Sequence, residues 1–261
     1  MARRNLAGRR VILTGASSGI GKYLALELAK NGCSLVVNSR RRDRLQELAH
    51  QIAEMGARPI IVAGDVSDEE VRQRIVASAI ENLDGVDILI NCAGIGAVGP
   101  FSQAEPGRLR KIFEVNFFAV VELIRISLPT LKNGTTPLIV NVGSVLGHRA
   151  VPNKSEYCAS KFALHGFSDA LRAELAADGI DVLLVSPSTT DSEFFDSLIE
   201  GKTAVDHKGK RPMSPELVAR KIIRAMQTGK HEIILSCGGR SLVWLDRLFP
   251  TLTNRLIARF K

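Results

Sequence analysis

The stretch Thr14-Gly15-Ala16-Ser17-Ser18-Gly19-Ile20-Gly21 decides the fold that we expect for this chain. It follows the apolar run Val11–Leu13, which is typical of a buried strand, and it precedes Lys22–Asn31, where Leu24 and Leu28 recur at helical spacing. Glycines at a strand-to-helix turn allow the backbone to approach a pyrophosphate, whose charge the helix amides then stabilise. The stretch therefore predicts a dinucleotide-binding loop.

The rest of the chain alternates between strands and helices. The expected strands are Ser34–Asn38, Ile60–Ala63, Val86–Ile90, Leu138–Val142, Val182–Val185 and Glu232–Leu235. The expected helices are Asp43–Met55, Ser67 (as N-cap) to about Asn82, 107–130, Ser155–Ala177 and Pro215–Thr228. Because the strands are nearly continuous apolar runs, this order predicts a single-domain α/β fold, a Rossmann-like, doubly wound parallel sheet of about seven strands flanked by helices. We assign this domain to residues 1–238 and a C-terminal amphipathic tail to residues 239–261.

Basic residues follow the second expected strand at its carboxyl end, which is where such sheets bind ligands. The chain there reads Ser39-Arg40-Arg41-Arg42, with no acid at the strand end. An acidic residue at this point would bind the ribose 2′-hydroxyl of NAD, whereas arginine matches the 2′-phosphate of NADP. Positive charge at a helix N-terminus is unfavourable by about 0.3–1 kcal/mol, so the run fits an anion better than a solvated helix start. We therefore predict NADP(H) as the cofactor.

A tyrosine and a lysine lie one helical turn apart in Tyr157-Cys158-Ala159-Ser160-Lys161, and Ser144 ends the preceding strand. An isolated tyrosine has a pKa near 10. An ammonium group ~4 Å away, at an effective dielectric constant of ~20, would favour the phenolate by about 4 kcal/mol, or about 3 pKa units. The spacing thus predicts that Tyr157 is a general acid/base whose pKa is lowered toward neutrality by Lys161.

Together these motifs resemble those of the classical short-chain dehydrogenase/reductase family over about residues 8–235. The matching motifs are Thr14-Gly15-x-x-x-Gly19-x-Gly21, Asp65-Val66, Asn91-x-Ala93-Gly94, Asn116, Ser144 and Tyr157-x-x-x-Lys161. The resemblance implies that Tyr157 protonates a carbonyl oxygen while NADPH delivers hydride. It also implies that Lys161 binds the nicotinamide ribose and that Ser144 positions the substrate oxygen.

The same resemblance implies roles for three further residues. A helix irregularity at Asn116 would hold a water in a proton relay, Asp65 would contact the adenine, and Asn91 would steady the sheet beside the cofactor. The predicted catalytic residues are Asn116, Ser144, Tyr157 and Lys161. The predicted cofactor-binding residues are Gly15, Ser17, Ser18, Gly19, Ile20, Gly21, Ser39, Arg40, Arg41, Asp65, Val66, Asn91, Ala93, Gly94, Tyr157, Lys161, Pro187, Thr189 and Thr190. No metal site is predicted, and His148 and His165 are interpreted as non-catalytic.

One loop departs from the family pattern. After the sixth strand the chain reads Pro187-Ser188-Thr189-Thr190, where the family usually has Pro-Gly, so Ser188 lacks the freedom of glycine at positive φ. Ser192 stands where the family often has a threonine near the cofactor. The polar segment that continues to Arg211 is interpreted as a substrate lid, with apolar side chains at Phe194, Phe195, Leu198 and Ile199.

The tail repeats apolar residues at helical spacing beside basic ones. The apolar residues are Leu242, Leu245, Leu248, Phe249, Leu252, Leu256, Ile257 and Phe260, and the basic ones are Arg247, Arg255, Arg259 and Lys261. Pro250 is expected to break the segment in two. Such a stretch suits an anionic membrane, but an apolar stripe more often covers its own domain or a sister subunit. A tail of this kind resembles those of short-chain reductases that act on steroids, retinoids or lipid ketones, which favours a hydrophobic substrate.

Composition narrows the choice of partners and compartment. The chain of 261 residues carries a net charge of +8, but no nucleic-acid motif accompanies the basic clusters, so we expect no nucleic-acid partner. The four cysteines are widely spaced, which indicates free thiols in a reducing compartment. We expect no signal peptide and no membrane span, and hence a cytoplasmic protein. Segments 107–130 and 155–177 resemble the helices that pair subunits in the family, which implies a homodimer or homotetramer.

The leading hypothesis is therefore an NADP(H)-dependent reductase of a ketone or aldehyde, or, in reverse, a dehydrogenase that oxidises the secondary alcohol. A 3-oxoacyl-carrier-protein reductase is the alternative enzyme, because an acidic carrier protein would suit the basic surface. Alternatives from other classes are a non-catalytic NADP-sensing protein and a membrane-surface protein. A sensor would have no need of Tyr157, Lys161 and Ser144, which disfavours it.

Overall fold

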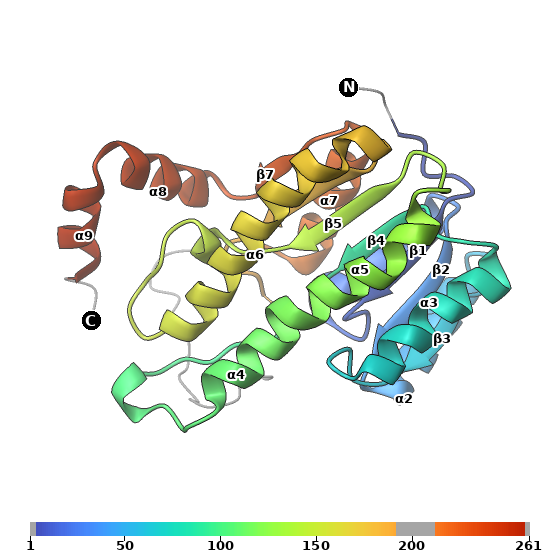
Figure 1. Ribbon diagram of the computed structural model, residues 1–261, viewed down its shortest axis with the longest axis horizontal. Coiled ribbons are helices and arrows are strands. Elements are labelled where there is room, and N and C mark those ends of the chain that lie inside the picture. Colours follow the sequence, from blue (N-terminus) through green and yellow to red (C-terminus); the bar gives the residue numbers. More distant parts are fainter. Residues whose placement is uncertain (1–3, 192–211, 259–261) are drawn as a thin grey trace.

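A seven-stranded parallel sheet forms the centre of the computed structural model, which describes residues 4–191 and 212–258 (Figure 1). The strands are β1 Arg10–Thr14, β2 Ser34–Ser39, β3 Ile60–Ala63, β4 Ile88–Asn91, β5 Leu138–Val142, β6 Asp181–Ser186 and β7 Glu232–Ile234. Their order is β3-β2-β1-β4-β5-β6-β7, and every pairing is parallel. The predicted Rossmann-like sheet is confirmed. The order reverses between β1 and β4, which is where open sheets of this kind bind ligands.

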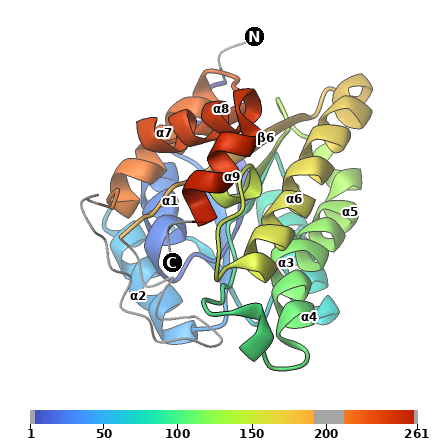
Figure 2. The ribbon, with the colours of Figure 1, turned by 90° about the vertical axis from the view of Figure 1, so that its left-hand side faces the viewer.

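Helices cover both faces of the sheet (Figures 1 and 2). They are α1 Gly19–Lys30, α2 Arg42–Ala53, α3 Glu69–Leu83, α4 Arg108–Phe113, α5 Ala119–Leu131, α6 Ser155–Glu174, α7 Pro215–Gln227, α8 Cys237–Leu248 and α9 Pro250–Ala258. Helices α1, α2 and α7 pack on one face, and α3, α5 and α6 pack on the other. In β1, Leu13 points to the first layer and Ile12 to the second, and both are fully buried. Because burying each such side chain contributes about 1.5–3 kcal/mol, a strand enclosed on both faces is a continuous apolar run.

The helix expected over 107–130 contains an irregular turn. Helices α4 and α5 are joined by a π-helical segment, Glu114–Phe118, in which Asn116 lies. This observation confirms the helix irregularity that the family resemblance implied. Single π-helical turns of this kind are frequent at functional sites.

Ser67 is not the N-cap of α3, contrary to the prediction from sequence. The helix begins at Glu69, after Asp68. The backbone N–H and the hydroxyl of Ser67 instead donate to Asp65 Oδ1, at 3.0 and 2.7 Å. The reason is local, because an aspartate side chain readily closes a turn with the residue two positions later.

A buried carboxylate joins the amino ends of the central strands. Asp87, just before β4, accepts hydrogen bonds from the backbone N–H, Nε and Nη2 of Arg10 at 2.9, 3.1 and 2.8 Å, and from the backbone N–H of Thr135 at 2.6 Å. Burial by itself raises the pKa of Asp87, but the hydrogen bonds from Arg10 and Thr135 and the charge of Arg10 lower that pKa overall. The carboxylate thus ties β1, β4 and the turn before β5 together at the end of the sheet opposite the ligand-binding edge.

Helices α8 and α9 form the tail and meet at Pro250, as predicted (Figure 1). Because α8 begins at Cys237, the predicted boundary after residue 238 falls inside this helix. Gly239 and Val243 are buried, so α8 packs against the domain along a narrow contact. Most of the large apolar side chains of the tail are exposed, namely Trp244, Leu248, Phe249, Leu252 and Leu256. No helix within the described residues combines the length and apolar composition that a membrane span requires.

Candidate active site

The glycine loop brings the ends of β1 and β4 into close contact. Gly15 has φ +70°, and a Cβ there would lie 2.8 Å from the Cα of Ala93. A Cβ on Gly21 would overlap the carbonyl oxygen of Gly15. The hydroxyl of Thr14 accepts hydrogen bonds from the backbone N–H groups of Cys92 and Ala93 at 3.1 and 3.2 Å. Glycine is therefore required at two positions for steric reasons, and the loop leaves the amides of α1 free to face an anion.

A cavity of about 670 Å³ runs along the carboxyl edge of the sheet. The predicted site residues that line it are Gly15, Ser17, Ser18, Gly19, Ile20, Gly21, Ser39, Arg40, Arg41, Asp65, Val66, Ala93, Gly94, Ser144, Tyr157, Lys161, Pro187, Thr189 and Thr190. Two predicted residues, Asn91 and Asn116, are not part of the lining. The glycine loop, the two arginines and the catalytic candidates therefore line one continuous cavity.

Two arginines follow β2 and lie beside the glycine loop. Nε and Nη2 of Arg41 donate to the hydroxyl of Ser17 at 3.3 and 3.1 Å. Nη1 of Arg40 lies 3.9 Å from Oδ2 of Asp65, which follows the next strand. Asp65 is the only acid among the described residues that line the cavity. The end of β2 therefore presents two guanidinium groups where this fold places the adenosine ribose of a dinucleotide.

Ser144, Tyr157 and Lys161 converge where β5 meets α6. A hydrogen bond links the hydroxyls of Ser144 and Tyr157. Nζ of Lys161 donates to the backbone carbonyl of Val142 at 2.9 Å and lies 5.9 Å from the centroid of the Tyr157 ring. The arrangement surrounds one point of the cavity with a phenol, a second hydroxyl and a cation, which are the groups needed to bind and protonate an oxygen atom.

Burial determines the protonation of Tyr157 and Lys161. It raises the pKa of Tyr157 to about 12, and the hydrogen bond with Ser144 offsets only part of the increase. Burial also lowers the pKa of Lys161 to about 8. The predicted lowering of the Tyr157 pKa by Lys161 is therefore wrong for this arrangement, because the low-dielectric surroundings disfavour the charged form of both groups. At neutral pH the phenol is protonated and able to donate.

The two predicted residues outside the cavity lining hold the surrounding backbone in place. Asn116 is fully buried and pairs with both the N–H and the carbonyl of Ile95 at 2.9 Å, while its amide also donates to Ser160 at 3.0 Å. Nδ2 of Asn91 donates to Oδ1 of Asn141 on the neighbouring strand at 2.9 Å. Asn116 thus fixes the loop after β4 against α6, and Asn91 joins β4 to β5.

Comparison with known proteins identifies the family. A model of the short chain dehydrogenase family matches residues 9–203. The chain belongs to the short-chain dehydrogenase family. A curated relative, the dehydrogenase/reductase SDR family protein 7-like of Anopheles gambiae, is 33% identical over 259 residues, which cover 95% of this chain and 82% of the relative.

Two solved structures extend the comparison. A short-chain dehydrogenase from Burkholderia cenocepacia in complex with NADP has a TM-score of 0.79 at 27% identity, over 88% of this chain and 96% of that chain. One from Burkholderia phymatum in complex with NAD has a TM-score of 0.87 at 23% identity, over 95% and 96%, and this likeness supports the fold alone. This short-chain dehydrogenase is therefore an oxidoreductase with a site for a nicotinamide dinucleotide, and the cradle that excludes a Cβ at Gly15 and Gly21 fits such a group.

Sequence reasoning missed the apolar side of the dehydrogenase cavity. The apolar lining includes Val98, Leu146, Val151 and, from α8, Leu242, and Lys154 also lines the cavity. No motif marks these residues, because they come from loops and from the tail. Only Lys154 carried a signal, since it lies at the N-terminal end of α6, three residues before Tyr157.

The loop after β6 is described in part. Ser188 lines the cavity. The non-glycine residues with positive φ in the described part of the chain are Asp84, Thr136 and Asn153, so Ser188 adopts a backbone conformation that does not require glycine. Ser192 and the predicted lid residues Phe194, Phe195, Leu198 and Ile199 lie outside the described residues.

Proposed function

We propose that the protein is an NADP(H)-dependent oxidoreductase that reduces a ketone or aldehyde, or oxidises the corresponding alcohol. The observation that carries the proposal is the convergence of Ser144, Tyr157 and Lys161 in the same cavity as the glycine loop. A nicotinamide cofactor, when bound, supplies or accepts the hydride. The chain then has to bind the substrate oxygen and move a proton to or from it.

Tyr157 is assigned as the residue that donates the proton to the substrate oxygen, or accepts it in the reverse direction. Its phenol is protonated at neutral pH, because burial raises its pKa to about 12, and a neutral phenol is the form that can donate to a carbonyl oxygen. Ser144, which is hydrogen-bonded to Tyr157, holds the same oxygen in reach. Lys161 is assigned to the nicotinamide ribose, and Asn116 to the water-holding irregularity of the π-helical segment. The cation of Lys161 would also stabilise the phenolate that forms after proton transfer.

The preference for NADP(H) is supported by Arg40 and Arg41. Both guanidinium groups line the cavity at the end of β2, and Arg41 contacts Ser17 of the glycine loop. A hydrogen bond to a charged group contributes about 1.5–3 kcal/mol. We therefore expect Arg41→Ala to raise KM for NADPH by about 10- to 100-fold with little effect on NADH, whereas Arg42→Ala, an exposed neighbour outside the cavity, should leave both unchanged. Equal losses for the two cofactors would contradict the assignment.

The substrate is proposed to be hydrophobic. Part of the cavity lining is apolar, including Val98, Leu146, Val151 and Leu242. Burying apolar substrate surface against such a lining contributes roughly 25 cal/mol per Å². This chemistry suits a steroid-like or lipid-like ketone better than a small polar one.

The test is a panel of ketones, aldehydes and alcohols of increasing apolar size, with NADPH or NADP consumption followed by absorbance. Tyr157→Phe should lose nearly all turnover while still binding NADPH. Tyr23→Phe, on α1, is the matched control, because it removes the same hydroxyl outside the cavity lining. If no substrate turns over, or if Tyr157→Phe retains activity, the proposed function is wrong.

We also propose peripheral contact of the tail with an anionic membrane surface. Support comes from Trp244, Leu248 and Phe249, which are exposed by 59%, 65% and 57%. The guanidinium of Arg247 lies 5.9 Å from the Trp244 ring, so an aromatic group and a cation are presented together. Amphipathic helices with this combination bind at the headgroup region of bilayers.

We also propose that the protein forms a homodimer or homotetramer in the cytoplasm. Phe118 and Phe162, on the π-helical segment and α6, are exposed by 49% and 43%, which supports pairing of subunits through this layer. The four cysteines are free thiols, and free thiols are typical of a reducing compartment.

A further inference from the structure

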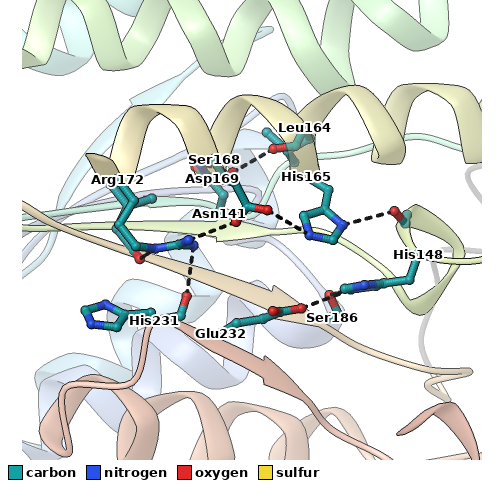
Figure 3. Close-up of polar contacts among 12 residues, drawn as sticks. Asn141, His148, Leu164, His165, Ser168, Asp169, Arg172, Ser186, His231 and Glu232 are labelled. Atoms are coloured by element: carbon teal, nitrogen blue, oxygen red, sulfur yellow. Dashed lines mark hydrogen bonds and ion pairs between the residues drawn. The ribbon is translucent and has the colours of Figure 1, made fainter. Parts of the chain in front are cut away.

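Three metal-ligating side chains meet outside the cavity described above. His148 follows the 3₁₀ turn Val145–Gly147, His165 belongs to α6, and Glu232 begins β7. One ligand atom from each lies within 4.8 Å of the others. Figure 3 shows the His165 ring extending from α6 toward the His148 ring, with Glu232 on the neighbouring strand. The three side chains therefore come together from parts of the chain that are far apart in sequence.

The separations are close to those of a zinc site. Zinc with ligand bonds of about 2.0–2.2 Å and tetrahedral angles places its ligand atoms about 3.4 Å apart. Nε2 of His148 lies 3.4 Å from Oε1 of Glu232, and one ligand atom from each of the three residues lies within 4.8 Å of the other two. The side chains of Glu232 and His165 are 35% and 17% exposed. Both can rotate by the small amount that would close the triangle.

A hydrogen bond to a backbone carbonyl orients the ring of His165 in the way that is common for metal-bound histidines. Nδ1 lies 3.2 Å from the carbonyl oxygen of Gly147, which can only accept, so this nitrogen carries the hydrogen. Metal-bound histidines commonly donate from their other nitrogen to a backbone carbonyl in this way. The lone pair of Nε2 then faces Oδ2 of Asp169 at 3.2 Å. Two acceptors at this distance repel unless a cation lies between them or the ring takes a second proton.

The ring of His148 is buried with Nε2 toward Glu232. The side chain is 2% exposed, and Nε2 is 2.8 Å from the hydroxyl of Ser186. Nδ1 is buried and has no hydrogen-bond partner among the described residues. When Nδ1 carries the hydrogen, Nε2 keeps its lone pair on the side of Glu232, where a metal ion would contact it.

We propose that His148, His165 and Glu232 form a binding site for a divalent transition-metal ion, with zinc as the best match to two imidazoles and a carboxylate. Asp169 adds a second carboxylate beside the site, and its other oxygen is held by Arg172 at 2.8 Å. The ion would join three elements: the turn after Ser144, the helix that carries Lys161, and the edge strand β7. The ion would thus link the edge strand β7 to α6, the helix that carries Tyr157 and Lys161, without contacting those two side chains.

The test uses the full chain, freed of metal by a chelator and titrated with zinc by calorimetry. We expect one zinc ion per chain and a higher Tm with zinc than without it. Glu232→Gln and His165→Asn should each weaken zinc binding by about tenfold or more. Glu232 is exposed, so its variant keeps the test valid if the histidine variant is unstable. His50→Asn, on the exposed side of α2, is the matched control and should bind zinc normally.

Cobalt provides the second readout, because cysteine thiolates are the competing ligands. A cobalt complex at the proposed site should show ligand-field absorption without a thiolate-to-cobalt charge-transfer band. The proposal is overturned if zinc does not bind, if binding survives both variants, or if the thiolate band appears.

Discussion

Removing the charge of Asp87 should destabilise the sheet at the end remote from the active site. In Asp87→Asn, a carboxylate that accepts four hydrogen bonds becomes an amide, whose NH₂ group must face a donor of Arg10 or Thr135. Breaking a buried ion pair costs about 3–5 kcal/mol. The Arg10 side chain is 22% exposed, so solvent screens part of its charge, and we expect a loss of about 2–3 kcal/mol. For a chain of this size such a loss lowers Tm by roughly 5–10 °C.

The assay is thermal and urea unfolding as a function of pH, with Asp84→Asn as control. Asp84 has φ 61°, a conformation that asparagine also adopts, so this variant should change stability little. The pKa of Asp87 is lower in the folded protein than in the unfolded chain. Its contribution is therefore fully present above the unfolded pKa of about 3.9 and is lost as the pH falls through the folded value. A loss below about 1 kcal/mol at neutral pH, or one that persists unchanged in acid, would refute the reasoning.

Further predictions concern the glycine loop, Lys161 and the tail. Gly21→Ala should abolish NADPH binding in a fluorescence titration, because its Cβ overlaps a backbone oxygen, whereas Gly166→Ala, with nothing within 4 Å, should bind normally; similar affinities would contradict this. The pKa of Lys161 is lowered from 10.5 to about 8 on folding, so the folded protein binds fewer protons than the unfolded chain between these values. The free energy of unfolding of the wild type, minus that of Lys161→Met, should thus rise by up to about 3 kcal/mol as the pH increases from about 8 to 10.5. A difference that does not change with pH in urea unfolding would exclude a lowered pKa of Lys161. Trp244→Ser, at an exposed site, should alter stability by less than about 0.5 kcal/mol yet reduce pelleting with anionic liposomes, and equal pelleting would count against membrane contact.

The fold was predictable because its strongest determinants are local. A strand buried on both faces must be an apolar run, and Val11–Leu13 and Leu138–Val142 are such runs. The glycine loop is equally local, since the requirement at Gly15 and Gly21 arises within one strand-to-helix turn. The candidate site followed from the fold, because parallel strands deliver their carboxyl ends to one edge.

The properties that escaped prediction depend on tertiary surroundings. Spacing places Tyr157 and Lys161 on one helix face, but it does not report how deeply they are buried, and desolvation reversed the expected direction of the Tyr157 pKa. The histidine cluster was invisible for a similar reason. His148, His165 and Glu232 come from a turn, a helix and an edge strand, and no sequence spacing links them.

The position of α8 has a consequence for altering the enzyme. This helix follows the last strand, and it reaches the cavity only through Gly238, Gly239 and Leu242. Grafting the corresponding helix from another member of the family would replace one side of the substrate chamber in a single step. The nucleotide cradle and the acid-base machinery lie upstream and would pass unchanged into the chimaera, so substrate selectivity and chemistry can be engineered separately.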